Sequence, residues 1–477
     1  MKKKNYIFTL ASVTLLSMTS CVDWLDQEPM SNVTTGSYFT RASEFEDAAN
    51  YLYNQVQGYN SKSNYELFDC GTDLSYLYDT ELSGNDGSVT IEAVCAFKAR
   101  VCLFEGTWEK YNGRGADDGT NGDGVSTGAG IAMPADYPSV DDLLTMARTE
   151  AAKFVDGGIY ANEYSLWMEC ENHTYDCMSY YYLFALEEAD SNPYGVTKAS
   201  NNEAIFRKCY DYALQVYGNQ NLSHSEPCGG SRKLMDMYLC SDGLPINISG
   251  LFQGYNGFDS EFQNRDARMI ASFKQIGHSY WSSNNEYGKP ADYSMAPDED
   301  PANNGGIYSP TLTSYSAGVY NGQFGYAGRK FCQERERPTT QESADLMLIR
   351  LPEMLMVYAE AVMELDGGIS DADLNKTVNV IRKRAHIADL TNALVDTYGL
   401  EMIEEIRRER TLELWGEGFR RLDLCRWGIA EEELSRPVCT YYVSYEGVPT
   451  QIATDDRPGH PGEKMYDASV WKQNPQW

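Results

Sequence analysis

The chain is poor in the residues that most often build metal sites and disulfide frameworks. It has 5 histidines among 477 residues, and no two of its 12 cysteines form a CxxC pair. Setting Cys21 aside leaves an odd number of cysteines, without the paired spacing of metal ligands. We therefore expect no disulfide framework, no metal site and no cofactor.

Basic residues are also scarce, which argues against two classes of partner. Lys and Arg number 39 against 70 Asp and Glu, so the formal net charge is −31. Proteins that bind nucleic acid or an anionic membrane face need a basic surface. Beyond the first 20 residues, no apolar run reaches the length needed to span a bilayer.

The first residues have the pattern of an export signal. Met1–Lys4 is basic, and Tyr6–Met18 is apolar but too short to cross a membrane. Small residues then precede Cys21, as in a bacterial lipobox, although Met18 is less typical at its first position. We predict a lipoprotein signal peptide over residues 1–20 and acyl chains, palmitate among them, on Cys21. The alternative is a secretory signal with an incidental cysteine.

The rest of the chain is predicted to hold a lipidated tether, 21–38, and a single domain, 39–477. Within that domain, periodicity predicts helical regions over 39–225 and 345–430. Residues 226–344 are rich in turn residues, so they are expected to be irregular and rich in loops. A long irregular segment inside a folded protein usually carries function. The C-terminal tail, 431–477, is also expected to be irregular.

Capping boxes and apolar stripes place the individual helices. Ser43–Glu46 caps the first helix, Ser139–Asp142 caps another that ends at Gly157-Gly158, and Val89–Tyr111 forms a long helix. Other segments are less regular. A helix is expected within Tyr175–Glu188, with Tyr180–Tyr182 too bulky to be wholly internal, and a strand or short helix within Ala204–Tyr217. Helical order resumes at Leu346, and residues 352–386 form an antiparallel pair of tetratricopeptide size, without that repeat's side-chain signature.

The stretch Glu404–Gly428 is predicted to be a helix that bends at Gly416 and Gly418. Its apolar residues cover more than one face, so the helix is expected to be buried. The charged residues on it are Glu409, Arg410, Glu413, Glu417, Arg420, Asp423 and Arg426. A pair of catalytic carboxylates is one reading. A structural ion-pair network is favoured, because acids this closely matched by arginines are held ionised and engaged.

Several motifs along the chain resemble the SusD/RagB family of Bacteroidetes outer-membrane lipoproteins. They are Arg350-Leu351-Pro352-Glu353, Tyr358-Ala359-Glu360-Ala361, Val380–Ala385, Glu409–Trp427, Asn264–Met269, Gly87–Val101, Glu105–Tyr111 and Gln473–Trp477. The lipobox at Cys21 and the acidic tether agree with this resemblance independently.

The resemblance implies a mostly α-helical fold of tetratricopeptide-like helix pairs, with a large, loop-rich ligand face and little β structure. It also implies a lid on a SusC-like TonB-dependent transporter, lipid-anchored in the outer membrane and facing the cell exterior. One departure concerns the N-terminal half. Where the family usually has two more long helices, this chain has a short linker, Asp79–Asp86.

Aromatic and polar residues that share a loop are the expected sugar site, because rings stack on pyranose faces while polar groups bond hydroxyls. The best such stretch contains Tyr280, Trp281, Asn284, Asn285 and Tyr287. Second choices are Asp69, Asp73, Tyr76, Tyr315, Tyr320 and Tyr326. The alternative for each aromatic side chain is that it packs into the core and holds its loop in place. For Trp281, polar neighbours on both sides favour a binding role.

The sequence thus predicts a non-catalytic, surface-exposed lipoprotein that captures oligosaccharides and delivers them to a SusC-like transporter. Three alternatives stay open. The ligand could be a peptide, as for some family members. The protein could be a glycoside hydrolase, which would need two carboxylates about 5 to 10 Å apart without matching arginines. It could also be a structural partner of the transporter that binds no ligand.

Overall fold

The structure, a computed structural model, describes the greater part of the chain between residues 75 and 453. The described ranges are 75–77, 90–113, 137–170, 178–192, 194–217, 228–254, 260–273, 328–331, 341–435, 439–443 and 449–453. All of them belong to the second of two compact units, Gln57–Trp477. The first unit, Met1–Val56, lies outside the described residues, as do the predicted signal peptide, tether and first helix.

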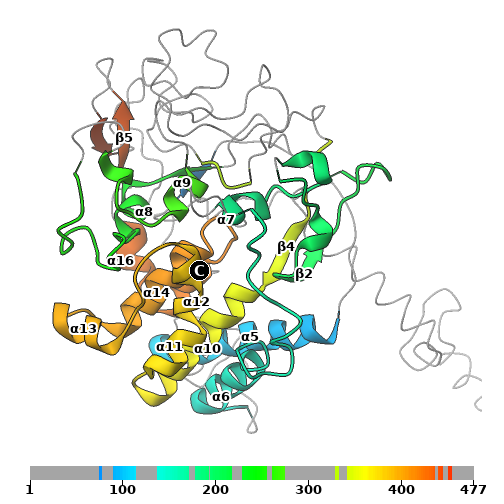
Figure 1. Cartoon of the computed structure of the whole chain (residues 1–477). Helices are drawn as coiled ribbons and strands as arrows, with labels where there is room; N and C mark the ends of the chain where they lie inside the picture. The colour runs from blue at the N-terminus through cyan, green and yellow to red at the C-terminus, as the bar shows by residue number, and fades with distance from the viewer. Residues whose placement is uncertain are drawn as a thin grey trace, which may run out of the picture. The chain divides into compact units, whose positions relative to one another are not determined.

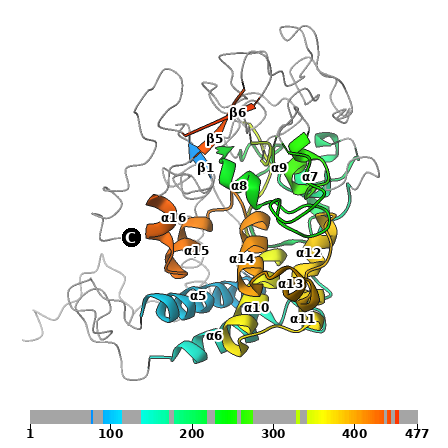
Figure 2. The same cartoon turned by 90° about the vertical axis from the view of Figure 1, so that its left-hand side faces the viewer.

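Four helices pack together as the main helical layer: α5 (Ile91–Asn112), α6 (Val140–Ala151), α10 (Leu351–Asp366) and α14 (Met402–Glu413). Figures 1 and 2 show α5 and α6 side by side, with α10 against them. At Gly106, an added Cβ would lie 3.0 Å from a side-chain carbon of Leu144. The small residue therefore permits the close approach of α5 and α6.

Local capping explains where the helices of this layer begin and end. Thr90 accepts a hydrogen bond from the Ala93 amide at the start of α5. Ser139 and Asp142 form the capping box of α6, with each side chain accepting from the other residue's backbone N–H. Among the described residues, no helix is long and apolar enough to span a membrane.

The predicted helix pair over 352–386 is present, but its second member is broken. Helix α11 (Asp371–Lys376) and helix α12 (Val378–Arg384) meet at Thr377, where φ is −129° and ψ is −92°. Helix α13 (Asn392–Tyr398) follows. No glycine or proline lies at Thr377, and the apolar residues keep helical spacing across it. The break therefore could not be predicted from the sequence.

The predicted bend at Gly416 and Gly418 separates two helices, α14 and α15 (Arg420–Arg426). Both glycines have positive φ, +77° and +83°. Only glycine adopts this conformation without strain, so the chain turns here. Helix α15 contacts α5, and the short helix α16 (Ala430–Ser435) follows it.

Strands form three two-stranded antiparallel sheets within the described residues. They pair β1 (Ser75–Leu77) with β3 (Cys228–Gly230), β2 (Ala204–Lys208) with β4 (Leu346–Arg350), and β5 (Cys439–Val443) with β6 (Pro449–Ala453). The expectation that helical order resumes at Leu346 is wrong, because that stretch is strand β4. Ala204 begins a strand, one of the two forms expected there.

Short elements occupy the regions that were expected to be irregular. Between 226 and 344 the structure places β3, helix α8 (Arg232–Met237), a 3₁₀ turn at Ser260–Phe262, and helix α9 (Arg268–Ser272). The tail from 431 contains most of α16 and the β5–β6 hairpin. These individual elements could not be predicted, because segments of three to six residues show little periodicity.

The tyrosine run was also misjudged. Helix α7 (Met178–Leu183) carries Tyr180, Tyr181 and Tyr182, whose exposed fractions are 0%, 1% and 1%. Tyr180 satisfies its buried hydroxyl by donating to the backbone carbonyl of Glu413 at 2.7 Å. A buried tyrosine with a partner for its hydroxyl is stable in a core.

Candidate functional site

Most of the predicted ligand residues lie outside the described residues. These are Asp69, Asp73, Tyr280, Trp281, Asn284, Asn285, Tyr287, Tyr315, Tyr320 and Tyr326. Tyr76 is in strand β1, opposite Gly229 of β3. The ligand loop therefore stays a prediction, and the described chemistry is concentrated around α14 and α15.

Glu413, at the end of α14, is fully buried and accepts hydrogen bonds from three arginines. Its Oε1 accepts from Arg350 and Arg384, each at 2.6 Å, and its Oε2 accepts from Arg268 at 3.0 Å. Burial alone would raise the pKa of this carboxyl, but the three guanidinium groups outweigh it and lower the pKa to about 2. Glu413 is therefore held ionised.

Glu417 follows in the turn between the glycines and binds a second set of cations. It accepts from Arg350 through both oxygens, at 2.7 and 2.6 Å, and from Lys330 at 2.7 Å. Although burial raises the pKa of Glu417, Arg350 and Lys330 lower it overall. Burial lowers the pKa of Lys330 to about 8, against the opposing pull of Glu417.

Helix α15 supplies a third group of ion pairs. Asp423 accepts from Arg410 at 2.9 Å and from Arg426 at 2.7 Å. Arg426 also forms a two-bonded pair with Glu360 of α10, at 2.6 and 2.7 Å. Burial raises the pKa of both carboxyls, but the arginines lower it in each case. This pairing ties α15 to α10.

The remaining charges of the predicted set are also engaged. Glu409 lies 2.7 Å from Arg268 and 3.0 Å from Arg382. Arg420 donates to the Thr411 hydroxyl at 3.1 Å. The structure therefore forms an ion-pair network of the kind expected. An ionised carboxylate has no proton to donate to a substrate, and these carboxylates are already hydrogen-bonded to arginine or lysine. The arrangement therefore suits a structural role better than catalysis.

Several members of the network were not foreseen as ion pairs. They are Arg268, Arg350, Arg382, Arg384, Glu203, Glu360 and Lys330. Each comes from an element far from α14 in sequence, so helical spacing could not reveal the pairing. One signal was available: Arg350 ends the apolar run Leu346–Ile349, where an isolated charge needs a buried partner.

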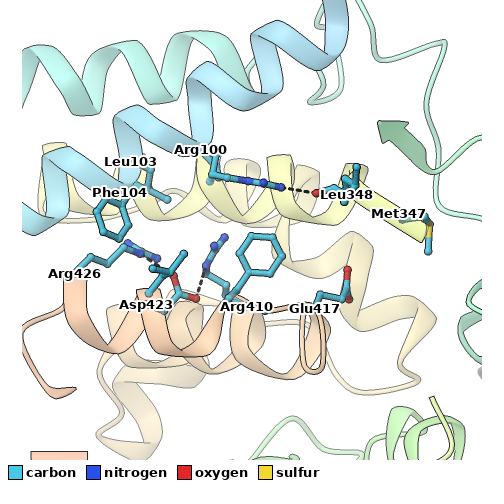
Figure 3. A pocket seen from close by; sticks show the side chains of 13 residues that line it. Arg100, Leu103, Phe104, Met347, Leu348, Arg410, Glu417, Asp423 and Arg426 are labelled. Carbon is cyan, nitrogen blue, oxygen red and sulfur yellow. Dashed lines mark hydrogen bonds and ion pairs between the residues drawn. The ribbon is translucent and has the colours of Figure 1, made fainter. Parts of the chain in front are cut away.

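A pocket of about 170 Å³ opens between α5, strand β4, the middle of α10, and the segment that runs from α14 to α15. Figure 3 shows α5 on one side, α14 and α15 on the other, and Arg410 reaching between them. Its residues are Arg100, Leu103, Phe104, Met347, Leu348, Val357, Arg410, Glu417, Gly418, Phe419, Leu422, Asp423 and Arg426. The pocket thus joins apolar walls to one edge of the ion-pair network.

The sequence matches the family model described as "SusD family" over residues 186–453. That range includes α14, α15 and the β2–β4 pair. It matches none of the curated proteins compared with it.

Several solved structures are similar to this chain. A SusD-like protein (BF3747) from Bacteroides fragilis is 19% identical, covering 80% of this chain and 62% of its own, with a TM-score of 0.46. A SusD-like carbohydrate binding protein (BF0978) from the same species is 18% identical, covering 85% and 90%, with a TM-score of 0.46.

The structure of BT4246 is 15% identical, covers 90% of this chain and 71% of its own, and has a TM-score of 0.52. This likeness concerns the fold. The predicted class, a mostly α-helical protein with little β structure, is confirmed by the helices and short strands of the described residues themselves. The match spans 62% of the length of BF3747, which is less than two thirds, and 71% of the length of BT4246.

Proposed function

The chain belongs to the SusD family, and from that premise we propose that it captures oligosaccharides at the cell surface and delivers them to a SusC-like TonB-dependent transporter. The match over residues 186–453 carries the proposal. The carbohydrate-binding relative from Bacteroides fragilis supports the ligand class. The aromatic loop Tyr280–Tyr287 supplies suitable chemistry, because stacked rings and amide groups bind sugars.

The proposal includes no catalytic step. The buried carboxylates around α14 are each engaged by arginine or lysine, as for Glu413 and Glu417. Release of reducing sugar from polysaccharide by the purified protein would show an enzyme instead.

Trp281 is the residue that we expect to matter most for retention on a glycan. Electrophoresis through gels that contain the bound polysaccharide measures this directly. We expect Trp281→Ala to reduce retention at least tenfold, because truncating an aromatic anchor at the centre of an interface costs about 2 kcal/mol or more. Tyr398→Ala is the control, because Tyr398 is 47% exposed on α13, away from the loop in sequence. Unchanged retention for Trp281→Ala would move the site elsewhere.

The proposed location is the outer membrane, through lipid on Cys21, facing the exterior. Stable anchoring requires acyl chains, each CH₂ contributing about 0.8 kcal/mol. We expect Cys21→Ala to leave the membrane fraction while the parent chain stays in it. A variant that still sediments with membranes would refute the lipid anchor. Co-purification with a TonB-dependent barrel in mild detergent tests the partner, and its failure would refute the delivery step.

A further inference from the structure

The pocket beside α15 contains an arginine with unused hydrogen-bonding capacity. Arg410 is 3% exposed, and its Nε donates to Asp423 at 2.9 Å. Its guanidinium also lies 5.1 Å from the ring centre of Phe419. Among the described residues, its Nη1 is buried and has no hydrogen-bond partner. Burying a charged donor without an acceptor costs free energy, because its hydrogen bonds to water are lost and not replaced. An acceptor bound at this position would recover part of that free energy.

The side chain is aimed at the pocket. Arg410 lines it, and Figure 3 shows the guanidinium directed away from α14 toward α5 and Arg100. A ligand in the pocket would therefore meet the guanidinium end of Arg410, which lines the cavity.

The other cations that line the pocket are already engaged by acids. Arg100 donates to both oxygens of Glu353, at 2.6 Å each, and to the Leu348 carbonyl at 2.7 Å. Arg426 is bonded to Glu360 and Asp423. Arg410 is thus the lining cation with a buried, unpartnered nitrogen in the described part of the chain.

Two acids also face the pocket, and both are neutralised by cations. Asp423 is bonded by Arg410 and Arg426. Glu417 is bonded by Arg350 and Lys330. With each acid shared between two cations, the repulsion that an incoming anion meets is reduced.

The rest of the lining is apolar and sets the shape of the ligand. The apolar side chains are Leu103, Phe104, Met347, Leu348, Val357, Phe419 and Leu422. Leu422 is 51% exposed and so lies at the mouth. A cavity of about 150 Å³ lined by such residues can hold benzene, and this pocket measures about 170 Å³.

We propose that this pocket is a binding site for a compact carboxylate with an apolar body, with the carboxylate on Arg410 and the body against the apolar walls. Benzoate and hexanoate have this size and chemistry. None of the lining residues belongs to the predicted glycan segment, and the proposal does not rest on the proposed function.

Isothermal titration of the full chain in non-ionic detergent at pH 7 tests the proposal. Benzoate is compared with benzamide, a neutral molecule of the same shape that also controls for partition into micelles. We expect saturable binding of benzoate at least tenfold tighter than that of benzamide. Equal affinities, or no saturable binding of benzoate, would overturn the proposal. Displacement of benzoate by an equal concentration of inorganic phosphate would also overturn it, because the apolar body would then contribute nothing.

Two variants locate the site. Arg410→Lys keeps the charge but removes the unpartnered Nη1, and we expect it to abolish the preference for benzoate over benzamide. Since that change also touches the Asp423 pair, Leu422→Trp at the exposed mouth provides a test that spares the network. It should weaken benzoate binding at least tenfold, whereas Leu214→Trp, at a leucine 74% exposed and outside the pocket lining, should not. Unchanged benzoate affinity in Leu422→Trp would place binding elsewhere and contradict the proposal.

Discussion

At the scale of single residues, Glu413 is the point where the scaffold depends most on charge. It is 0% exposed and accepts from Arg268, Arg350 and Arg384. Removing one partner from a buried ion pair leaves the opposite charge buried without compensation, which typically lowers the free energy of unfolding by about 3–5 kcal/mol. Glu413 thus stabilises the fold through the cations that converge on it.

Replacing Glu413 by alanine is therefore expected to lower the free energy of unfolding by about 3–5 kcal/mol at pH 7. The pKa of Glu413 is about 2, against an ordinary value of 4.5, so its contribution is present above pH 4.5. That contribution is lost as the pH falls through 4.5 toward 2, and it amounts to about 3 kcal/mol. Urea unfolding of both proteins at several pH values measures this, and the difference between them should shrink over that range.

The matched control is Glu401→Ala, a change at an exposed glutamate that makes no side-chain cap at the start of α14. Its effect should stay within about 0.5 kcal/mol. A Glu413→Ala variant that keeps its stability but loses ligand binding would contradict the structural role of the network.

The acids of this network could be predicted from the sequence because they lie on one predicted helix. Most of their partners could not. Arg384 and Arg268 reach Glu413 across 29 and 145 residues of sequence, and helical spacing carries no information at such distances. The pocket beside Arg410 was invisible for the same reason, since its walls come from α5, β4, α10, α14 and α15.

At the scale of elements, a cap and an apolar stripe predicted where helix α6 begins, although it ends at Ala151 and not at Gly157-Gly158 as expected. The capping box at Ser139 starts α6, and the glycines at 416 and 418 separate α14 from α15. Strand β4 was mistaken for helix because Leu346–Ile349 is uniformly apolar, a pattern common to buried strands and helices. Its pairing of Ala204 with Arg350 is a long-range contact that only the folded chain reveals.

The end of α10 offers a direct test of how glycine sets an element boundary. Gly367 has φ of +67°, whereas its neighbour Gly368 has no such positive φ, and an added Cβ meets nothing within 4 Å at either position. We expect Gly367→Ala to lower the free energy of unfolding by about 1–2 kcal/mol, the cost of a left-handed conformation for alanine. Thermal unfolding measures the change.

Gly368→Ala is the paired control. It should be neutral or slightly stabilising, because alanine restricts the unfolded chain without straining the folded one. Equal losses from the two substitutions would show that backbone conformation is not what fixes this helix end.

At the scale of the whole molecule, the family and the mostly α-helical class were predicted from motifs such as Arg350–Glu353 and Glu409–Trp427. The family model confirms the first, and the elements of the described residues confirm the second. Those motifs lie in the scaffold and not in the ligand loop. The Glu409–Trp427 segment contains the end of α14, all of α15 and the acids on which the buried network converges, which explains why it identifies the family without naming the ligand. The predicted ligand segment, Tyr280–Tyr287, lies outside the described residues, so the ligand has to be identified by experiment.

The most direct test of the central claim is a binding screen of the full chain, in detergent, against a glycan array and a peptide library in parallel. The account predicts retention of one or a few oligosaccharides, each recovered intact, with no comparable retention of peptides. Retention of peptides alone, or recovery of shortened glycans, would contradict capture of oligosaccharides without cleavage.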